Sequence, residues 1–272
     1  MSTYVMSDIH GCLEQLKEKM NLVDLDGNNK LLFLGDYIDY GSESGPVLRF
    51  VYDLQKQYGK DKVIVLKGNH EAMLLEWIDE YNKPVTKDME ELSYDSWLET
   101  DENHHFNTFR TLVTEAQFLE FSDFSKTASY AKKNAEAVRM ILETSGELIK
   151  WMQSMELFYQ TETQIFVHAG VDEEAEEYWE WGSGEDIFLW KFPASRGKFV
   201  KTVIAGHVGT DSLARDKMFH SIFYDGKSHY YIDGSVYNRG RLLLLGYDEN
   251  NQKYYQIEKR GKFEIEKYDF IS

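Results

Sequence analysis

Five short runs of apolar and β-branched residues recur along the chain, and each run ends at a polar side chain. Runs of this length between turn residues are typical of buried strands rather than of helices. Aspartate, histidine or asparagine follows each run, usually beside a glycine. The runs occupy residues 4–6, 31–34, 63–66, 164–167 and 202–205.

Helical patterns separate the first three runs. Leu13, Leu16 and Met20 share one face of a helix predicted from residue 13 to about residue 22. A second helix is predicted from about residue 46 to residue 58, because Pro46 suits a first helical turn and an apolar stripe follows it. This alternation predicts parallel strands joined by right-handed crossovers, and therefore an α/β fold.

Residues 82–156 carry no strand pattern and are rich in aromatic and charged residues. Residues 129–155 are predicted to form one or two helices with a break at Gly146. We interpret 82–156 as a helical insertion packed beside the sheet within a single domain of residues 1–272. Its aromatic residues are expected to form core rather than a ligand platform.

The remaining predicted elements are short strands. A hairpin is predicted over 157–168, and several short antiparallel strands are predicted after residue 207. The five C-terminal predictions are residues 222–224, 229–232, 241–247, 253–257 and 263–265.

Charge and composition narrow the function. The net charge of −17 argues against a general nucleic-acid-binding surface and against binding to anionic membranes. Cys12 is the only cysteine, so no intramolecular disulfide can form. No run of about 18 apolar residues and no leader-like segment is present, which favours a cytoplasmic protein.

The polar residues after the five runs form five ordered motifs. Ligands bind at the carboxyl ends of parallel strands, and clustered aspartate, histidine and asparagine are typical of a hydrolytic metal site. Each motif alone is weak, but five in order, each at a strand end, favour such a site. The motifs are Ser7-Asp8-Ile9-His10-Gly11, Gly35-Asp36-Tyr37-Ile38-Asp39, Gly68-Asn69-His70-Glu71, His168-Ala169-Gly170 and Gly206-His207.

A two-metal site would account for this set of side chains. Such a site lowers the pKa of a bound water and clamps phosphate oxygens between two ions, one carboxylate bridging both. Asp8 and His10, two residues apart, can reach one ion, and Asp36 at the next strand end can bridge. The ligands that can complete the second ion are Asn69, His168 and His207.

The ordered motifs resemble those of the calcineurin-like metallophosphoesterase superfamily, G-D-x-H-G, G-D-x-V-D-R-G, G-N-H-E/D, H-G/A-G and G-H. The closer likeness is to the phosphoprotein phosphatase group, which includes bacterial serine/threonine phosphatases and symmetrical diadenosine tetraphosphatases. The resemblance covers about residues 3–247, with 82–156 unaligned. It implies a four-layer αββα sandwich around two β-sheets.

The resemblance also implies roles for individual residues. The first metal would be held by Asp8, His10 and Asp36, and the second by Asp36, Asn69, His168 and His207. His70 would be the general acid, oriented by Asp39, while a hydroxide bridging the two metals attacks phosphorus. The expected cofactors are two transition-metal ions, manganese or iron, with zinc as a further candidate.

One departure from the family pattern affects substrate binding. Tyr40 stands where the family has an arginine that would grip phosphate through a bidentate contact. Lys191 and Arg196 are candidates to supply the missing positive charge. Together with Asn69 and Tyr40, they complete the expected set of substrate-binding residues.

Three functions remain open from the sequence. The first is a metal-dependent phosphatase acting on phosphomonoesters, including phosphoserine or phosphothreonine in proteins. The second is a hydrolase of symmetrical dinucleoside tetraphosphates or another nucleotide anhydride. The third, for which Tyr40 is the only support, is a non-catalytic phosphate-binding scaffold. The expected partner is therefore a phosphorylated protein or a small phosphorylated metabolite or nucleotide.

Overall fold

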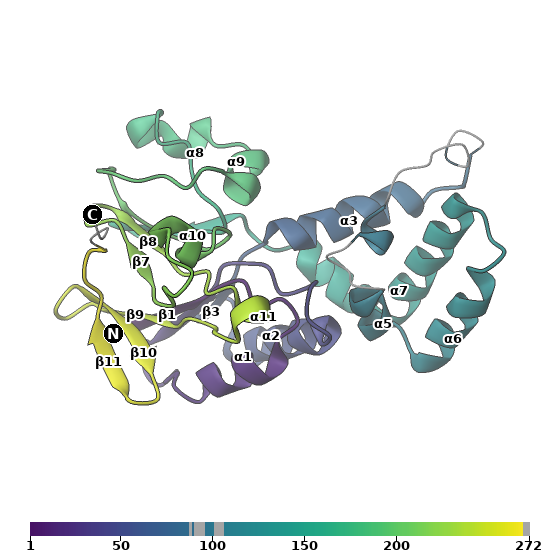
Figure 1. The fold of residues 1–272 in the computed structure, drawn as a ribbon, viewed down its shortest axis with the longest axis horizontal. Helices are drawn as coiled ribbons and strands as arrows, with labels where there is room; N and C mark the ends of the chain where they lie inside the picture. The colour runs from purple at the N-terminus through teal and green to yellow at the C-terminus, as the bar shows by residue number, and fades with distance from the viewer. Residues whose placement is uncertain (87–88, 90–95, 101–105, 269–272) are drawn as a thin grey trace.

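Two β-sheets pack face to face in the computed structural model, which describes residues 1–86, 89, 96–100 and 106–268 (Figure 1). Helices cover the outer face of each sheet, which gives the four-layer αββα sandwich expected from the sequence.

The first sheet joins the two ends of the chain. Its parallel part, β1–β2–β3, confirms the predicted alternation of strands and helices. β1 also pairs antiparallel with β9, and β10 and β11 extend the sheet beyond it. The order is β11-β10-β9-β1-β2-β3, with β1 (Ser2–Met6), β2 (Lys30–Phe33), β3 (Val63–Val65), β9 (Leu245–Asp248), β10 (Lys253–Glu258) and β11 (Gly261–Glu264).

The second sheet corrects one prediction. Residues 229–232 were expected to join an antiparallel set, but β8 runs parallel to β6 and antiparallel only to β7. The connection after β6 passes through the short helix α10 (Thr210–Ala214) to β7, and the β7–β8 hairpin then returns the chain to the direction of β6. The order is β4-β5-β6-β8-β7, with β4 (Phe158–Gln160), β5 (Gln164–Val167), β6 (Thr202–Ala205), β7 (Phe223–Tyr224) and β8 (His229–Tyr231).

The helices agree with the sequence patterns at most boundaries. α1 and α2 begin within two residues of the predicted starts, and the break in the longest helix falls at Ser145, next to the predicted Gly146. The remaining helices are α1 (Leu13–Met20), α2 (Ser44–Tyr58), α3 (Asn69–Tyr81), η1 (Trp97–Glu99), α5 (Asn107–Leu112), α6 (Glu115–Phe124), α7 (Tyr130–Gln153), η3 (Glu176–Tyr178), α8 (Trp179–Gly182), α9 (Glu185–Trp190) and α11 (Val236–Arg239).

Alternating side chains divide the strands between two cores. Side chains that are neighbours across paired strands fill the space between the two sheets. They are Val5, Leu32, Ile64 and Leu245 from the first sheet, and Phe166, Ile204 and Tyr230 from the second. The intervening residues, such as Met6 and Phe33, face the helices. Because both faces are buried, the strands read as continuous apolar runs in the sequence.

The helical insertion shares its core with the first sheet. Phe109 and Ile141 belong to the same buried cluster as Met6 and Phe33. The Trp151 indole in α7 donates a hydrogen bond to the side chain of Gln55 in α2 at 2.8 Å. Helices α5 to α7 lie at the opposite end of the molecule from both termini (Figure 1). The shared core supports the prediction of a single domain with a helical insertion. The single domain itself stays a prediction. Parts of 82–156 lie outside the described residues.

The helices in the described part of the chain include none that is both long and apolar enough to cross a lipid bilayer.

A buried ion cluster ties the second sheet to the loop after β5. The His229 ring at the start of β8 lies 2.9 Å from Asp225 and 3.1 Å from Glu173, one carboxylate at each ring nitrogen. Burial opposes the charged ring, but the two carboxylates outweigh it and raise the pKa of His229 to about 9.

The cluster predicts a pH-dependent contribution to stability. A histidine whose folded pKa exceeds its unfolded value stabilises fully below the unfolded pKa near 6.5, and loses that contribution as pH rises through about 9. We expect the difference in unfolding free energy between wild type and His229→Gln to shrink over this interval, by at most about 1.4 kcal/mol per pH unit. Urea unfolding at several pH values measures it.

The matched control is His220→Gln, which removes a histidine whose described contact is made by its backbone carbonyl. A wild-type minus His229→Gln difference that stays constant from pH 6 to pH 9 would show that the ring is neutral in the folded protein.

Candidate metal centre

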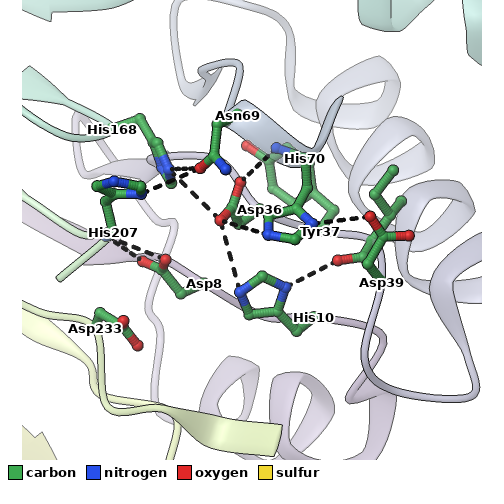
Figure 2. A network of polar contacts seen from close by, with 12 residues as sticks. Asp8, His10, Asp36, Tyr37, Asp39, Asn69, His70, His168, His207 and Asp233 are labelled. Carbon is green, nitrogen blue, oxygen red and sulfur yellow. Dashed lines mark hydrogen bonds and ion pairs between the residues drawn. The ribbon is translucent and has the colours of Figure 1, made fainter. Parts of the chain in front are cut away.

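All five motifs meet at one end of the two sheets, where the loops after β1, β2, β3, β5 and β6 converge (Figure 2). His168 is completely buried beneath this point, while the side chains of six other motif residues line a cavity of 360 Å³. A larger cavity of 680 Å³ near β10 and β11 has no histidine in its lining. The smaller cavity is lined by Asp8, His10, Asp36, Tyr40, Asn69, His70, Met73, Trp190, His207, Asp233, Ser235, Tyr237 and Asn238.

The loops carry unusual backbone angles at the motif residues. Asp8, His10, Asp36 and His207 have φ values of 54°, 44°, 57° and 63°. Non-glycine residues enter this left-handed region at a cost, and such strain gathers at functional sites. The Asp36 carbonyl accepts hydrogen bonds from the backbone N–H groups of Ile9 and His10 at 2.7 and 2.9 Å, which joins the first two motifs.

Two glycines allow the backbone to approach the carboxylates closely. A Cβ atom at Gly68 would lie 2.1 Å from the Asp36 Oδ1 atom, and one at Gly206 would lie 2.1 Å from the Asp8 Oδ2 atom. Any other residue at these positions would displace a carboxylate of the cavity, which explains the glycine before Asn69 and before His207.

Glu71 holds the second motif in place. Its buried carboxylate accepts backbone N–H bonds from Asp36 at 2.9 Å, Tyr37 at 2.8 Å and Gly68 at 3.0 Å. The residue therefore links the first turn of α3 to the loop that carries Asp36. The sequence analysis named Glu71 only as part of the third motif and did not predict these hydrogen bonds.

Two imidazole rings present unprotonated nitrogens to Asp36. The Nδ1 atoms of His10 and His168 donate to the carbonyls of Ile38 and Leu34 at 2.9 and 3.0 Å. Burial lowers the pKa of both rings, so each is neutral and its Nε2 atom carries a lone pair. These Nε2 atoms lie 3.6 and 3.5 Å from the Asp36 Oδ2 atom. A backbone acceptor on the other ring nitrogen is typical of metal-ligating histidine.

Asn69 and His207 are further candidate ligands beside His168. The Asn69 side-chain oxygen lies 2.7 Å from His168 Nε2 and 3.1 Å from His207 Nδ1. Burial, followed by the neighbouring His168, lowers the pKa of His207 to about 4, so this ring is neutral as well. A cation beside the Asn69 oxygen would satisfy the Nε2 atom of His168, whose Nδ1 proton is already donated to the Leu34 carbonyl.

The donor set suits two transition-metal ions. Two groups of side chains have ligand atoms that all lie within 4.8 Å of one another: His10, Asp36 and His70, and Asp36, His168 and His207. Asp36 belongs to both groups, so it could bridge two ions, as expected from the sequence. Imidazole nitrogens with carboxylate and amide oxygens fit manganese, iron or zinc.

Asp8 lies at the edge of this arrangement. Both of its carboxylate oxygens accept the backbone N–H of His207 at 3.1 Å, and it belongs to neither group. Burial, together with the charges of Asp233 and Asp36, raises the pKa of Asp8 well above its usual value. A cation in the cavity would relieve this crowding of three carboxylates.

His70 forms a buried dyad with Asp39. The Nδ1 atom of His70 lies 2.8 Å from Asp39 Oδ2, and its Nε2 atom lies 3.9 Å from Asp36 Oδ2 (Figure 2). Burial lowers the pKa of His70, but the Asp36 and Asp39 carboxylates overcome it and raise this pKa to about 9. The ring could therefore carry a proton at neutral pH.

The helical insertion holds the carboxylate of this dyad. The Trp97 indole donates to Asp39 Oδ2 at 3.1 Å, and the Thr108 hydroxyl donates to Asp39 Oδ1 at 2.7 Å. The sequence interpretation missed both residues, because they are 58 and 69 positions from Asp39 and follow no strand. It also missed Asp233 as a lining residue, although Ile232-Asp233-Gly234 follows β8 as the other motifs follow their strands.

The expected substrate-binding residues divide into two pairs. Asn69 and Tyr40 line the cavity, but Lys191 and Arg196 do not. The Lys191 ammonium contacts the Val171 carbonyl and lies 3.8 Å from Glu173. The Arg196 guanidinium donates to the Leu213 carbonyl at 2.8 Å. Both cations are thus engaged elsewhere, and the described lining contains no lysine or arginine.

Comparisons with known proteins agree with this chemistry. Residues 1–211 match the family model described as calcineurin-like phosphoesterase. The chain is 30% identical over 145 residues to a symmetrical bis(5'-nucleosyl)-tetraphosphatase of a Marinomonas species, covering 49% of this chain and 50% of that protein. The corresponding Wigglesworthia glossinidia brevipalpis protein is 37% identical over 76 residues, which is 28% of this chain and 26% of that protein.

A solved structure shares the fold at low identity. The protein serine/threonine phosphatase from Saccharomyces cerevisiae matches with a TM-score of 0.54 and 14% identity, covering 100% of this chain and 81% of that chain. The curated relatives are matched over at most about half of their length, since the covered shares are 26% and 50%.

The dyad geometry predicts a role for Thr108. Thr108→Val removes the hydroxyl that orients Asp39, and we expect kcat for p-nitrophenyl phosphate to fall about tenfold with an unchanged KM and metal content. Thr108→Ser should restore kcat because it keeps the hydroxyl. Steady-state kinetics with metal analysis measures this.

Thr111→Val is the matched control, since Thr111 lies on the same helix as Thr108 and has no hydrogen bond to Asp39. Its hydroxyl accepts the Gly45 N–H of α2 and donates to the Thr108 carbonyl, each at 2.8 Å, so the control removes a hydroxyl of the same interface. An equal fall in kcat for the two valine variants would mean that Thr108 acts only through stability.

Proposed function

Because the chain belongs to the calcineurin-like phosphoesterase family, we propose that it is a metal-dependent phosphatase that hydrolyses phosphomonoesters, with phosphoserine and phosphothreonine in proteins among its candidate substrates. The observation that carries the proposal is the convergence of unprotonated His10 and His168 nitrogens on Asp36, beside the His70–Asp39 dyad.

Each motif residue has a role in this proposal. Asp8, His10 and Asp36 line the cavity together and would hold one ion. Asp36, which belongs to both candidate groups, would be shared with a second ion, held also by Asn69, His168 and His207. When bound, two such ions supply a nucleophilic water at neutral pH and neutralise charge on the phosphate.

His70 acts on the leaving group. Its Nε2 atom lies on the Asp36 side of the ring, while Nδ1 is held by Asp39. This arrangement suits donation of the Nε2 proton to the leaving oxygen as its bond to phosphorus breaks. Asp39, fixed by Trp97 and Thr108, keeps the ring in one orientation.

The charge around the cavity favours a monoester over a polyphosphate. The described lining carries Asp8, Asp36 and Asp233 and no lysine or arginine. Metal ions at the centre would neutralise one phosphate, but further phosphates of a polyphosphate chain would find no lysine or arginine among the described lining residues.

A second candidate is hydrolysis of symmetrical dinucleoside tetraphosphates. The names of the curated relatives from Marinomonas and Wigglesworthia favour it. Turnover of a phosphoserine peptide and of diadenosine tetraphosphate by the same metal-loaded preparation separates the candidates. Cleavage of the dinucleotide with no action on the peptide would favour this second candidate.

His70→Asn tests the proposed acid role. We expect kcat to fall about 100-fold or more for phenyl phosphate, whose leaving oxygen needs a proton, and to fall much less for p-nitrophenyl phosphate. Metal content should be retained. Rates for a series of aryl phosphates, plotted against the pKa of the leaving phenol, measure this.

The same plot for wild type is the reference. An equal loss for all leaving groups would contradict proton donation by His70, and a loss of metal would instead make His70 a ligand.

A further inference from the structure

Aromatic rings stand at the cavity where a positive charge was expected. Tyr40, Trp190 and Tyr237 belong to its lining, and the last two are 45% and 43% exposed. Tyrosine and tryptophan offer a flat apolar face together with one polar atom, which suits them to bind planar groups.

Tyr40 and Tyr237 form a pair beside the dyad. Their rings are stacked, with centroids 5.7 Å apart and planes inclined by 28°. Tyr40 also contacts His70 and His10, with centroid distances of 5.3 and 4.8 Å. The pair therefore lies at the His70 end of the metal centre.

Trp190 lies at the opposite end of the centre. The edge of its ring approaches His207, with centroids 6.3 Å apart, and it ends helix α9. The Tyr40–Tyr237 pair, not Trp190, is thus the aromatic surface next to the proposed proton donor.

The backbone fixes the position of Tyr40. Its φ of 58° lies in the left-handed region, which is costly for a bulky side chain, so the surrounding structure imposes this conformation. Tyr237 comes from α11, which follows Asp233 after β8. Two loops far apart in the sequence thus build one aromatic surface.

We propose that the Tyr40–Tyr237 pair is a binding subsite for a planar aromatic ring in the leaving group of the substrate. The subsite narrows the proposed phosphomonoesters to aromatic ones and ranks phosphoserine and phosphothreonine, whose leaving groups are alkyl, below them. This inference rests on the proposed function, because His70 identifies the leaving-group side. A phosphate at the metal centre with its leaving oxygen at His70 directs the attached group towards these rings. Stacking then supplies affinity that a phosphate-binding arginine would otherwise supply.

Binding of two phosphonates to the manganese-loaded protein tests the subsite. Phenylphosphonate and methylphosphonate carry the same anionic group and have no ester bond, so leaving-group chemistry does not enter. We expect phenylphosphonate to inhibit p-nitrophenyl phosphate turnover about tenfold more tightly than methylphosphonate. Tyr237→Leu should bring the ratio close to one and leave methylphosphonate inhibition unchanged, while Tyr237→Phe should keep the ratio.

Trp181→Leu is the control, because Trp181 is 91% exposed and lies outside the cavity lining. Tyr40→Leu is the second variant, in case Tyr237→Leu does not fold. Equal affinity of wild type for the two phosphonates, failure to bind either, or a ratio that survives both leucine substitutions overturns the subsite.

A second pair of ligands shows whether the aromatic ring of the substrate is a nucleobase or an aryl group. AMP and ribose 5-phosphate differ by the nucleobase, so a preference for AMP that Tyr237→Leu removes indicates a nucleotide. Preference for phenylphosphonate alone indicates an aryl ester, and either result supports the subsite. Calorimetric titration of the same phosphonates keeps the test separate from the proposed function, because a preference without any p-nitrophenyl phosphate hydrolysis would contradict only the enzyme.

Discussion

The site depends on the placement of unprotonated histidine nitrogens around the Asp36 carboxylate. The rings of His10 and His168 are turned by backbone carbonyls so that their free nitrogens face Asp36 Oδ2 at 3.6 and 3.5 Å. A cation bound there would accept these electron pairs, because neither ring carries a proton on the nitrogen that faces Asp36. The left-handed loop residues, Gly68 and Gly206, and the backbone hydrogen bonds to Glu71 all hold Asp36 and its neighbours in this arrangement. We therefore infer that this end of the fold binds metal.

The helical insertion serves the same centre from a distance. Its core is continuous with that of the first sheet, and two of its side chains, Trp97 and Thr108, hold Asp39. The His70–Asp39 dyad therefore depends on a segment that has no motif of its own. A change of the insertion would alter the surroundings of His70 through Asp39.

Local patterns predicted most of the fold and the candidate ligands, because each ligand follows a strand that is buried on both faces. The antiparallel pairing of β8 with β7 was predicted, but its parallel pairing with β6 was not, since the second partner of a short strand depends on a connection of several elements rather than on its own residues. Lys191 was a reasonable candidate by position, but its side chain packs along Gly170 and reaches the Val171 carbonyl instead. Contacts of this kind, like those of Trp97, form only when distant segments meet.

Metal stoichiometry shows whether Asp36 is a ligand shared by two ions. We would load wild type and Asp36→Asn with manganese, remove free metal and measure bound metal by elemental analysis, with Asp211→Asn as a control because that carboxylate pairs with Arg239 outside the cavity lining. We expect about two equivalents in wild type and in the control, and a loss of binding in Asp36→Asn, because the shared ligand is removed. Two equivalents retained by Asp36→Asn, or none bound by wild type, would contradict it.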